Sequence, residues 1–268
     1  QLECLSGVET IGFERKCRKL CCYWQSFSFR SIGMTDKNGI LYGIGVGPGE
    51  PGLMTIKALN TIRSCDVILL PAASKEECYA YKIAYEVCPE IEEKSLVCMP
   101  FPMIRDEEKL ELAHEKNYHV IEDYMRKGKC VGMLTIGDPS VYSTYLYMHH
   151  CAVEAGFQAD MISGVPSFCA SACRLGISLG KKQEEIHIIP ASYDVQKALS
   201  YSGTCIYMKS GKHLKELLAG LRVQQAKGRK FKAYGVANCG MENEQVYLGL
   251  DELEGAEGYL TTVIVKME

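Results

Sequence analysis

The stretch at residues 40–55 reads ILYGIGVGPGEPGLMT. It starts as an apolar run, passes into a loop rich in glycine and proline, and leads into a helix-like segment from Leu53 to Arg63. Glycine permits tight backbone turns in such a loop, whereas Pro48 and Pro51 stiffen it and remove N–H donors. The loop is therefore not the dinucleotide-binding fingerprint, which needs those donors for a pyrophosphate. The succession of strand, loop and helix predicts an α/β domain.

Apolar runs separated by helical patterns continue outward from this stretch. Helices are predicted for Glu107–Arg126 and Ser143–Ala155. Strands are predicted for residues 66–72, 95–101, 130–137 and 159–165. Near-continuous apolar strands that alternate with helices indicate a mostly parallel sheet covered on both faces.

A second series of strands follows a helix-like segment, SFCASACRLG. It comprises residues 185–191, 204–210, 231–238, EQVYLGL and YLTTVIVKM. The last two runs lie close together, which is consistent with antiparallel pairing. The pattern breaks near Ser163 to Ser167, so we predict an N-terminal α/β domain at 39–162 and a C-terminal α/β domain at 163–268.

Residues 1–38 differ from the rest of the chain. They are rich in cysteine and aromatic residues, and Met34 stands just before the first strand. We expect this leader to be an extension outside the fold, added by an upstream start or by cloning, with residues 1–33 dispensable; the alternative is a genuine extension that packs on the surface. Cys17 and Cys21 begin the spacing of an iron–sulfur motif, but Trp24 stands where its third cysteine belongs, which argues against a cluster.

Composition limits the classes of function. The formal charge of −3 over 268 residues gives no broad attraction to nucleic acid or to an anionic membrane. No apolar run is long enough to span a bilayer. The 14 cysteines form no C-x-x-C and lie in apolar runs, which indicates a reducing, cytoplasmic setting without a zinc site. His149 and His150 are neighbours on a predicted helix and cannot share a face, so no metal is expected there.

Three further motifs carry glycine, proline and hydroxyl residues. They are TIGDPSVYST at 135–144, SGVPSFCASACRLGISL at 163–179 and YMKSGKHL at 207–214. The first ends an apolar strand, and the ends of parallel strands are where open α/β sheets bind ligands. Asp138 in this motif is a candidate for handling a proton, and the alternative is a helix cap.

From Ile40 to Met267 the chain resembles the tetrapyrrole (class III, S-adenosylmethionine-dependent) methyltransferases. The resemblance rests on LYGIGVGPG, on GDP followed by YST, and on GVANCGMENEQVY. Within that family these motifs look like the branch that methylates C20 of precorrin-2 or its cobalt complex, in cobalamin biosynthesis. The resemblance implies two α/β domains of the tetrapyrrole methylase fold, S-adenosylmethionine (SAM) in the cleft between them, and a homodimer.

Carried over residue by residue, the resemblance also implies a set of SAM contacts. These are Pro48, Ile136, Gly137, Asp138, Ser143, Thr144, Pro166, Ser167, Met208, Ala237, Thr261 and Thr262. Where the family commonly has a hydroxyl residue this chain has Pro166, so a side-chain hydrogen bond expected there is absent.

The substrate class carries many carboxylates, which calls for basic residues around the cleft. The candidates are Arg105, Lys209, Lys212 and His213, with Lys181 and Lys182; the alternative for each is solvated surface charge. Methyl transfer from a sulfonium needs alignment more than a nucleophilic side chain, so we expect positioning to dominate catalysis, with Asp138 as the candidate catalytic residue. The alternatives are another ring carbon as acceptor, a diphthamide intermediate or ribosomal RNA, or a non-catalytic SAM- or tetrapyrrole-binding module.

Overall fold

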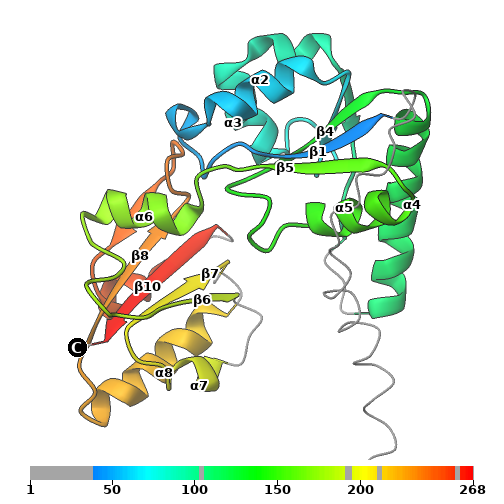
Figure 1. Cartoon of the computed structure of the whole chain (residues 1–268). Coiled ribbons are helices and arrows are strands. Elements are labelled where there is room, and N and C mark those ends of the chain that lie inside the picture. The colour runs from blue at the N-terminus through cyan, green and yellow to red at the C-terminus, as the bar shows by residue number, and fades with distance from the viewer. Residues whose placement is uncertain (1–38, 103–105, 191–194, 210–212, 257–259, 268) are drawn as a thin grey trace, which may run out of the picture. The chain divides into compact units, whose positions relative to one another are not determined.

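The computed structural model describes residues 39–102, 106–190, 195–209, 213–256 and 260–267, all within the compact unit 37–268. The leader predicted at 1–38 lies outside the described residues. The described chain forms two five-stranded sheets with helices (Figure 1). The predicted α/β fold class is confirmed, and the strands of the first sheet all precede those of the second.

The first sheet is entirely parallel, as its apolar strands predict. Its strand order is β3-β2-β4-β1-β5, with β1 paired to both β4 and β5. The strands are β1 (Ile40–Gly45), β2 (Val67–Leu70), β3 (Ser95–Cys98), β4 (Cys130–Thr135) and β5 (Gln158–Ile162). Because parallel strands all end at the same edge, the loops after β1, β4 and β5 are brought together.

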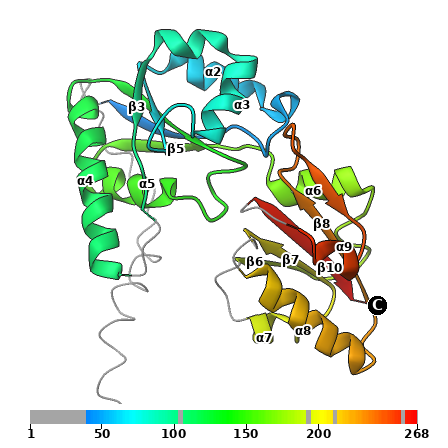
Figure 2. The same ribbon diagram turned by 180° about the vertical axis from the view of Figure 1, so that it is seen from behind.

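Helices cover both faces of this sheet, because successive side chains on a strand point to opposite faces. Ile68 and Leu70 of β2 belong to one buried cluster, and Val67 and Leu69 belong to the other. The first cluster includes α2 (Ile56–Ser64), α3 (Tyr79–Val87) and the 3-10 turn η3 (Pro89–Glu93). The second includes α4 (Glu107–Arg126) and α5 (Tyr145–Glu154), seen beside each other in Figure 2. The helix expected from Leu53 begins instead at Ile56, after the 3-10 turn η2 (Pro51–Leu53).

The second sheet is mixed, with the order β6-β7-β10-β8-β9. Its strands are β6 (Ile186–Pro190), β7 (Thr204–Met208), β8 (Phe231–Ala237), β9 (Gln245–Tyr247) and β10 (Thr261–Met267). The pairing expected between the last two strands is wrong. Strand β8 lies between them and pairs antiparallel with both. The apolar run containing β9 ends early, since Leu250 already starts α9 (Leu250–Leu253).

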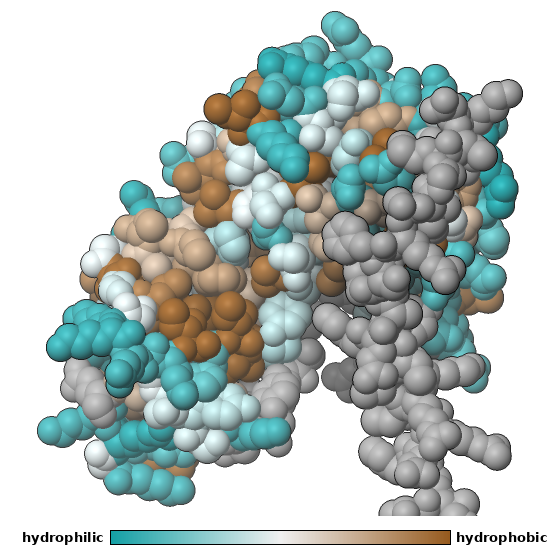
Figure 3. Space-filling model, in the orientation of Figure 1, coloured by the Kyte–Doolittle hydropathy of each residue, from teal (hydrophilic) through white to brown (hydrophobic). Residues whose placement is uncertain are grey.

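One face of the second sheet packs on α7 (Val195–Ala198), α8 (Leu214–Ala226) and α9. The other face packs on α6 (Ser167–Leu175), through Ile206 and Ile264. Apolar side chains gather over these strands beside α6 (Figure 3). Ile186 and Ile188 on the edge strand β6 are 46% and 39% exposed. This face therefore leaves apolar surface open to solvent at the edge of the sheet.

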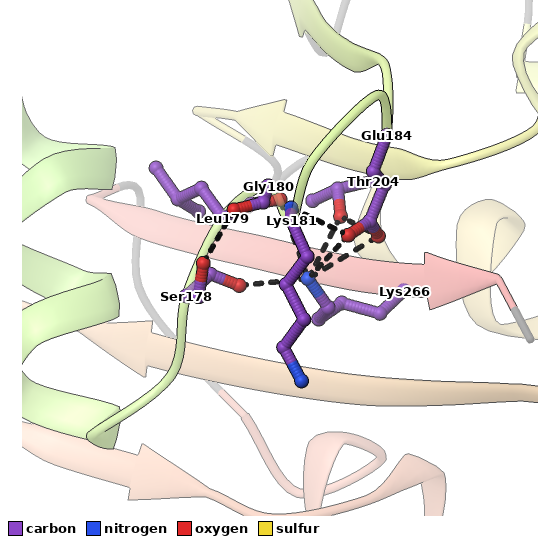
Figure 4. Close-up of polar contacts among 7 residues, drawn as sticks. All are labelled: Ser178, Leu179, Gly180, Lys181, Glu184, Thr204 and Lys266. Atoms are coloured by element: carbon purple, nitrogen blue, oxygen red, sulfur yellow. Dashed lines mark hydrogen bonds and ion pairs between the residues drawn. The ribbon is translucent and has the colours of Figure 1, made fainter.

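A lysine ties the loop after α6 to the second sheet (Figure 4). The ammonium of Lys266 donates to the carbonyl oxygens of Ser178 and Leu179, at 2.7 and 3.3 Å, and contacts Glu184 and the hydroxyl of Thr204. Thr204 in turn donates to Glu184 at 2.9 Å. These contacts, the hydrogen bond from Thr204 first, lower the pKa of Glu184. The ammonium of Lys266 therefore has acceptors within the protein for its N–H donors.

The described residues form neither a metal centre nor a membrane span. Among them, no three histidine, cysteine, aspartate or glutamate side chains are grouped as metal ligands would be. No helix in the same part of the chain is both long and apolar enough to cross a membrane.

Candidate functional site

A pocket lies where strands of both sheets end. The first sheet supplies the loops that follow the carboxyl ends of β1, β2, β4 and β5. The second sheet supplies the end of β7, the turn after β8 and the start of the antiparallel strand β10. The lining residues are Pro48, Pro71, Thr135, Ile136, Gly137, Asp138, Val141, Tyr142, Ser143, Thr144, Pro166, Ser167, Met208, Lys209, Cys239, Leu260, Thr261 and Thr262. Strand ends of an α/β sheet are the usual place for a ligand.

Backbone packs directly on backbone on the first-sheet side of the pocket. Gly47 and Gly137 form an isolated bridge, with the N–H of Gly137 donating to the carbonyl of Gly47 at 2.7 Å. A Cβ atom on Gly164 would lie 2.1 Å from the carbonyl oxygen of Gly137, and one on Gly45 would lie 2.6 Å from it. Three strand ends therefore meet where only glycine fits.

Gly137 has space around its Cα for a side chain, but its backbone conformation is one that residues with a side chain rarely adopt. Its φ is +74°, and the nearest atoms to an added Cβ are 3.8 Å away or more. The loop after β4 thus turns at a left-handed residue whose Cα faces the pocket. A side chain at this position would be strained and would enter space that a ligand needs.

Asp138 closes the loop after β4. It is 8% exposed, and its Oδ1 accepts from the N–H and hydroxyl of Ser140 at 2.8 and 2.5 Å. Its Oδ2 accepts from the N–H of Gly164, at 3.0 Å, in the loop after β5. The side chain therefore holds two pocket loops together, and both of its oxygens have hydrogen-bond partners.

Hydroxyl groups line the pocket from both sheets. The hydroxyl oxygens of Thr135 and Ser143 lie 3.2 Å apart across the loop after β4. The Ser143 hydroxyl also accepts a hydrogen bond from the N–H of Tyr145. The hydroxyl oxygen of Ser167, at the start of α6, lies 3.4 Å from that of Thr262 in β10. These short side chains donate and accept without filling the pocket, so they suit a ligand with hydroxyl, amide or carboxylate groups.

Two pocket residues other than glycine have left-handed backbone. Tyr142 has φ +47° and Lys209 has φ +57°, and Asn238, next to the pocket residue Cys239, has φ +51°. The ammonium of Lys209 donates to the carbonyl oxygen of Tyr142 at 3.1 Å, and the Tyr142 hydroxyl donates to the carbonyl of Ile188. Left-handed residues with side chains are strained and cluster at functional sites.

Lys209 is the basic side chain that lines the described pocket. The residue as a whole is exposed, yet protein atoms around the ammonium displace water and lower its pKa. Within the described part of the chain it donates to one acceptor, the Tyr142 carbonyl, compared with several for Lys266. An ammonium has three donors, so Lys209 has capacity for an anionic ligand.

The structure brings together nearly all residues implied as SAM contacts. Eleven of the twelve line the pocket: Pro48, Ile136, Gly137, Asp138, Ser143, Thr144, Pro166, Ser167, Met208, Thr261 and Thr262. Ala237 is not among the lining residues; it is buried at the end of β8, paired with Thr261.

The basic residues predicted to bind the substrate do not all lie at the pocket. Lys209 lines the pocket, whereas His213 does not and lies 3.7 Å from Glu216 at the start of α8. Lys181 and Lys182 are exposed residues away from the lining. Arg105 and Lys212 lie outside the described residues.

Several lining residues carried no signal in the sequence. Pro71 and Leu260 are ordinary apolar residues next to strand ends, and Val141, Tyr142 and Cys239 lie inside motifs without being singled out. Burial raises the pKa of the Cys239 thiol, which marks it as a packing residue. The order of the first sheet, which places β2, β4, β1 and β5 side by side, brings Pro71, Val141 and Tyr142 to the pocket. The ends of β8 and β10 bring Cys239 and Leu260.

Known proteins resemble this chain over most of its length. A family model, Tetrapyrrole (Corrin/Porphyrin) Methylases, matches residues 40–254. The chain is 34% identical over 231 residues to the "Probable cobalt-precorrin-2 C(20)-methyltransferase" of Methanocaldococcus jannaschii, covering 84% of this chain and 95% of that one. It is 27% identical to the "Cobalt-precorrin-2 C(20)-methyltransferase" of Salmonella typhimurium, covering 64% of this chain and 73% of the relative.

Solved structures show the same fold. A cobalt precorrin-4 methyltransferase matches with a TM-score of 0.66 and 18% identity, over 85% of this chain and 94% of the other. The uroporphyrin-III C-methyltransferase of Thermus thermophilus, solved in complex with S-adenosylhomocysteine, matches with a TM-score of 0.63 and 17% identity, over 85% and 97%. From the matched family model, the relatives and the fold it follows that this chain belongs to the tetrapyrrole (corrin/porphyrin) methylase family.

Proposed function

We propose that this chain transfers a methyl group from SAM to C20 of precorrin-2 or cobalt-factor II, in cobalamin biosynthesis. One observation carries the proposal: eleven of the twelve residues that the family resemblance implies as SAM contacts come from five separate segments of sequence and line one pocket. The relatives from Methanocaldococcus jannaschii and Salmonella typhimurium, both named for C20 methylation of cobalt-precorrin-2, support this acceptor.

The pocket residues fit SAM by their chemistry. When bound, SAM supplies an electrophilic methyl group on a sulfonium. The backbone of Ile136 and Gly137 offers close approach, the hydroxyls of Ser167 and Thr262 offer hydrogen bonds, and the Met208 side chain offers apolar contact. A pocket that is mostly apolar with a few convergent polar groups is typical of a small-molecule site.

In the proposal, catalysis comes mainly from positioning. The carboxylate of Asp138 is engaged by Ser140 and Gly164, so its role is to hold the loop that faces the cofactor. A proton that leaves the acceptor carbon would be taken by a water or a tyrosine near this loop. Aligning two reactants lowers the barrier of a bimolecular step by several kcal/mol, on the order of 7 to 11 in favourable cases.

Lys209 is the side chain we propose to bind the acceptor. Its ammonium has spare donors at the pocket wall, whereas the donors of Lys266 are used inside the second sheet. A polycarboxylate tetrapyrrole would supply acceptors for Lys209. Arg105, Lys212 and His213 remain further candidates for the same substrate.

The proposal extends to the setting of the enzyme. We expect a cytoplasmic homodimer, and the exposed apolar residues Ile186 and Ile188 on β6 are the first surface to examine for the contact between copies. Measuring the mass in solution, before and after Ile188→Asp, tests this expectation. A monomeric wild type would contradict it.

The decisive experiment uses labelled SAM with precorrin-2 and with cobalt-factor II, kept anaerobic. The proposal predicts one labelled methyl on C20, located by NMR, and we expect the cobalt complex to be the better acceptor. Label on another ring carbon would establish the first alternative acceptor. SAM binding without transfer would indicate a binding module. S-adenosylhomocysteine found away from Ile136–Asp138 in a co-crystal would overturn the site.

A further inference from the structure

We infer that Glu244, held by Arg174, positions the SAM-binding loop at Pro48 from outside the pocket. The inference rests on the proposed function, because it concerns the affinity of the same pocket for SAM. Glu244 lies between β8 and β9 and is not a lining residue. Three contacts connect it to Pro48 and to α6.

The first contact is between two backbones. The loop at Gly49 and the turn at Gly240 pack so closely that neither tolerates a side chain. A Cβ on Gly49 would lie 2.1 Å from the carbonyl oxygen of Cys239, and a Cβ on Gly240 would lie 2.4 Å from the N–H nitrogen of Glu50. Pro48 and Cys239, one residue before each glycine, both line the pocket. The turn therefore fixes how far Pro48 enters the pocket.

The second contact holds that turn. Gly240 has φ +76°, and its N–H donates to Oε2 of Glu244 at 2.7 Å. The turn is closed further by the N–H of Met241, which donates to the carbonyl of Asn238 at 2.9 Å. The Glu244 side chain is 14% exposed, so this hydrogen bond is shielded from water. Without the carboxylate, the Gly240 N–H would be left without this acceptor.

The third contact orients Glu244. Its Oε1 pairs with the Arg174 guanidinium at the C-terminal end of α6, and Arg174 is 62% exposed. The other end of α6 supplies Pro166 and Ser167 to the pocket. Glu244 thus links α6, the turn at Gly240 and the Pro48 loop, without itself touching the pocket.

The test compares three variants of the pair by their affinity for S-adenosylhomocysteine. Glu244→Leu removes the acceptor and should raise Kd about tenfold or more. Glu244→Gln keeps a carbonyl for the Gly240 N–H and should restore most of that affinity. Arg174→Met, at an exposed position, should raise Kd about threefold. The KM for SAM should rise in the same order, while kcat at saturating SAM stays within about twofold, which a general loss of structure would not produce.

The matched control is Arg222→Met, which removes an arginine that pairs with Asp251 and Glu254 at the surface of α8 and α9. It should leave the affinity unchanged. If Glu244→Leu does not fold, Arg174→Met decides. The inference is wrong if Arg174→Met, and Glu244→Leu where it folds, bind like the wild type while Gly137→Val, at a residue that lines the pocket, does not. If Gly137→Val also binds like the wild type, the proposed site itself is wrong.

Discussion

The two sides of the pocket are built by different means. On the first-sheet side, Gly45, Gly137 and Gly164 meet backbone to backbone, and an added Cβ would approach within 2.1 to 2.6 Å of main-chain atoms at two of them. On the second-sheet side, the lining is made of side chains, among them Met208 and Thr262. The difference indicates that glycine packing fixes the shape of the first side, whereas the second side depends on side chains, and side chains from both sheets set which chemical groups a ligand meets.

The largest expected effect is at the glycine contact. Gly164→Ala would place a Cβ 2.1 Å from the carbonyl oxygen of Gly137, and main-chain atoms cannot yield as a flexible side chain does. We expect binding of S-adenosylhomocysteine to be lost and the free energy of unfolding to fall by about 1–3 kcal/mol. Calorimetry and thermal denaturation measure both.

Gly52→Ala is its matched control, since the atom nearest to an added Cβ there is a Glu50 side-chain oxygen at 3.6 Å. The control should bind normally. Normal binding by Gly164→Ala would refute the difference drawn between the two sides.

The second-largest effect is expected at Asp138, whose side chain bonds two loops on the first-sheet side of the pocket. Asp138→Asn replaces one acceptor by a donor, so the N–H of Gly164 or the groups of Ser140 lose a partner. We expect a loss of about 1–3 kcal/mol in stability or SAM affinity. Methyl transfer should stay detectable in single-turnover experiments, because positioning is impaired and no nucleophile is removed. Complete loss of transfer with SAM still bound would instead assign Asp138 a direct part in the chemistry.

A smaller effect, on a different ligand, is expected at Lys209 on the second side. Lys209→Met keeps most of the length of the side chain and removes its charge. The KM for the tetrapyrrole should rise about tenfold, equivalent to about 1.4 kcal/mol, with SAM affinity little changed. Lys181→Met is the control, since Lys181 is exposed and away from the lining. A change in SAM affinity equal to the change in KM would place Lys209 in the cofactor half of the site.

The smallest effect on the pocket is expected from the Lys266 network, which lies in the second sheet but outside the lining. The pKa of Glu184 is lowered from its usual 4.5 by the hydrogen bond from Thr204 and by Lys266. The stabilisation is therefore complete above about pH 4.5 and is lost as the pH falls through the lowered pKa of the folded state. Glu184→Gln should flatten the acid limb of stability against pH, measured by urea denaturation, and leave S-adenosylhomocysteine affinity at neutral pH unchanged. An unaltered acid limb would show that the pair contributes nothing.

The two sheets differ in how well their strands and strand pairing could be predicted from the sequence. The parallel sheet was predictable because its apolar strands are bounded by glycine and separated by helical patterns. The pairing of the last strands was not, because proximity in sequence favoured β9 with β10, whereas β8 lies between them. Similarly, the apolar run after Gln245 reads as one strand, but Leu250 and Leu253 turn to the core as a short helix.

The α/β class, the glycine-rich strand ends and the resemblance that implies the SAM contacts follow from the amino-acid sequence, because period, turn chemistry and motif order are properties of the chain. The three-dimensional fold was needed to show that Gly45, Gly137 and Gly164 touch and that Lys209 rather than His213 lines the pocket, and to infer that Glu244 supports Pro48 from outside. These facts depend on which strand ends are neighbours and on how backbones pack across distances of tens of residues. No local pattern encodes them, since each contact joins segments whose own preferences are already satisfied without it.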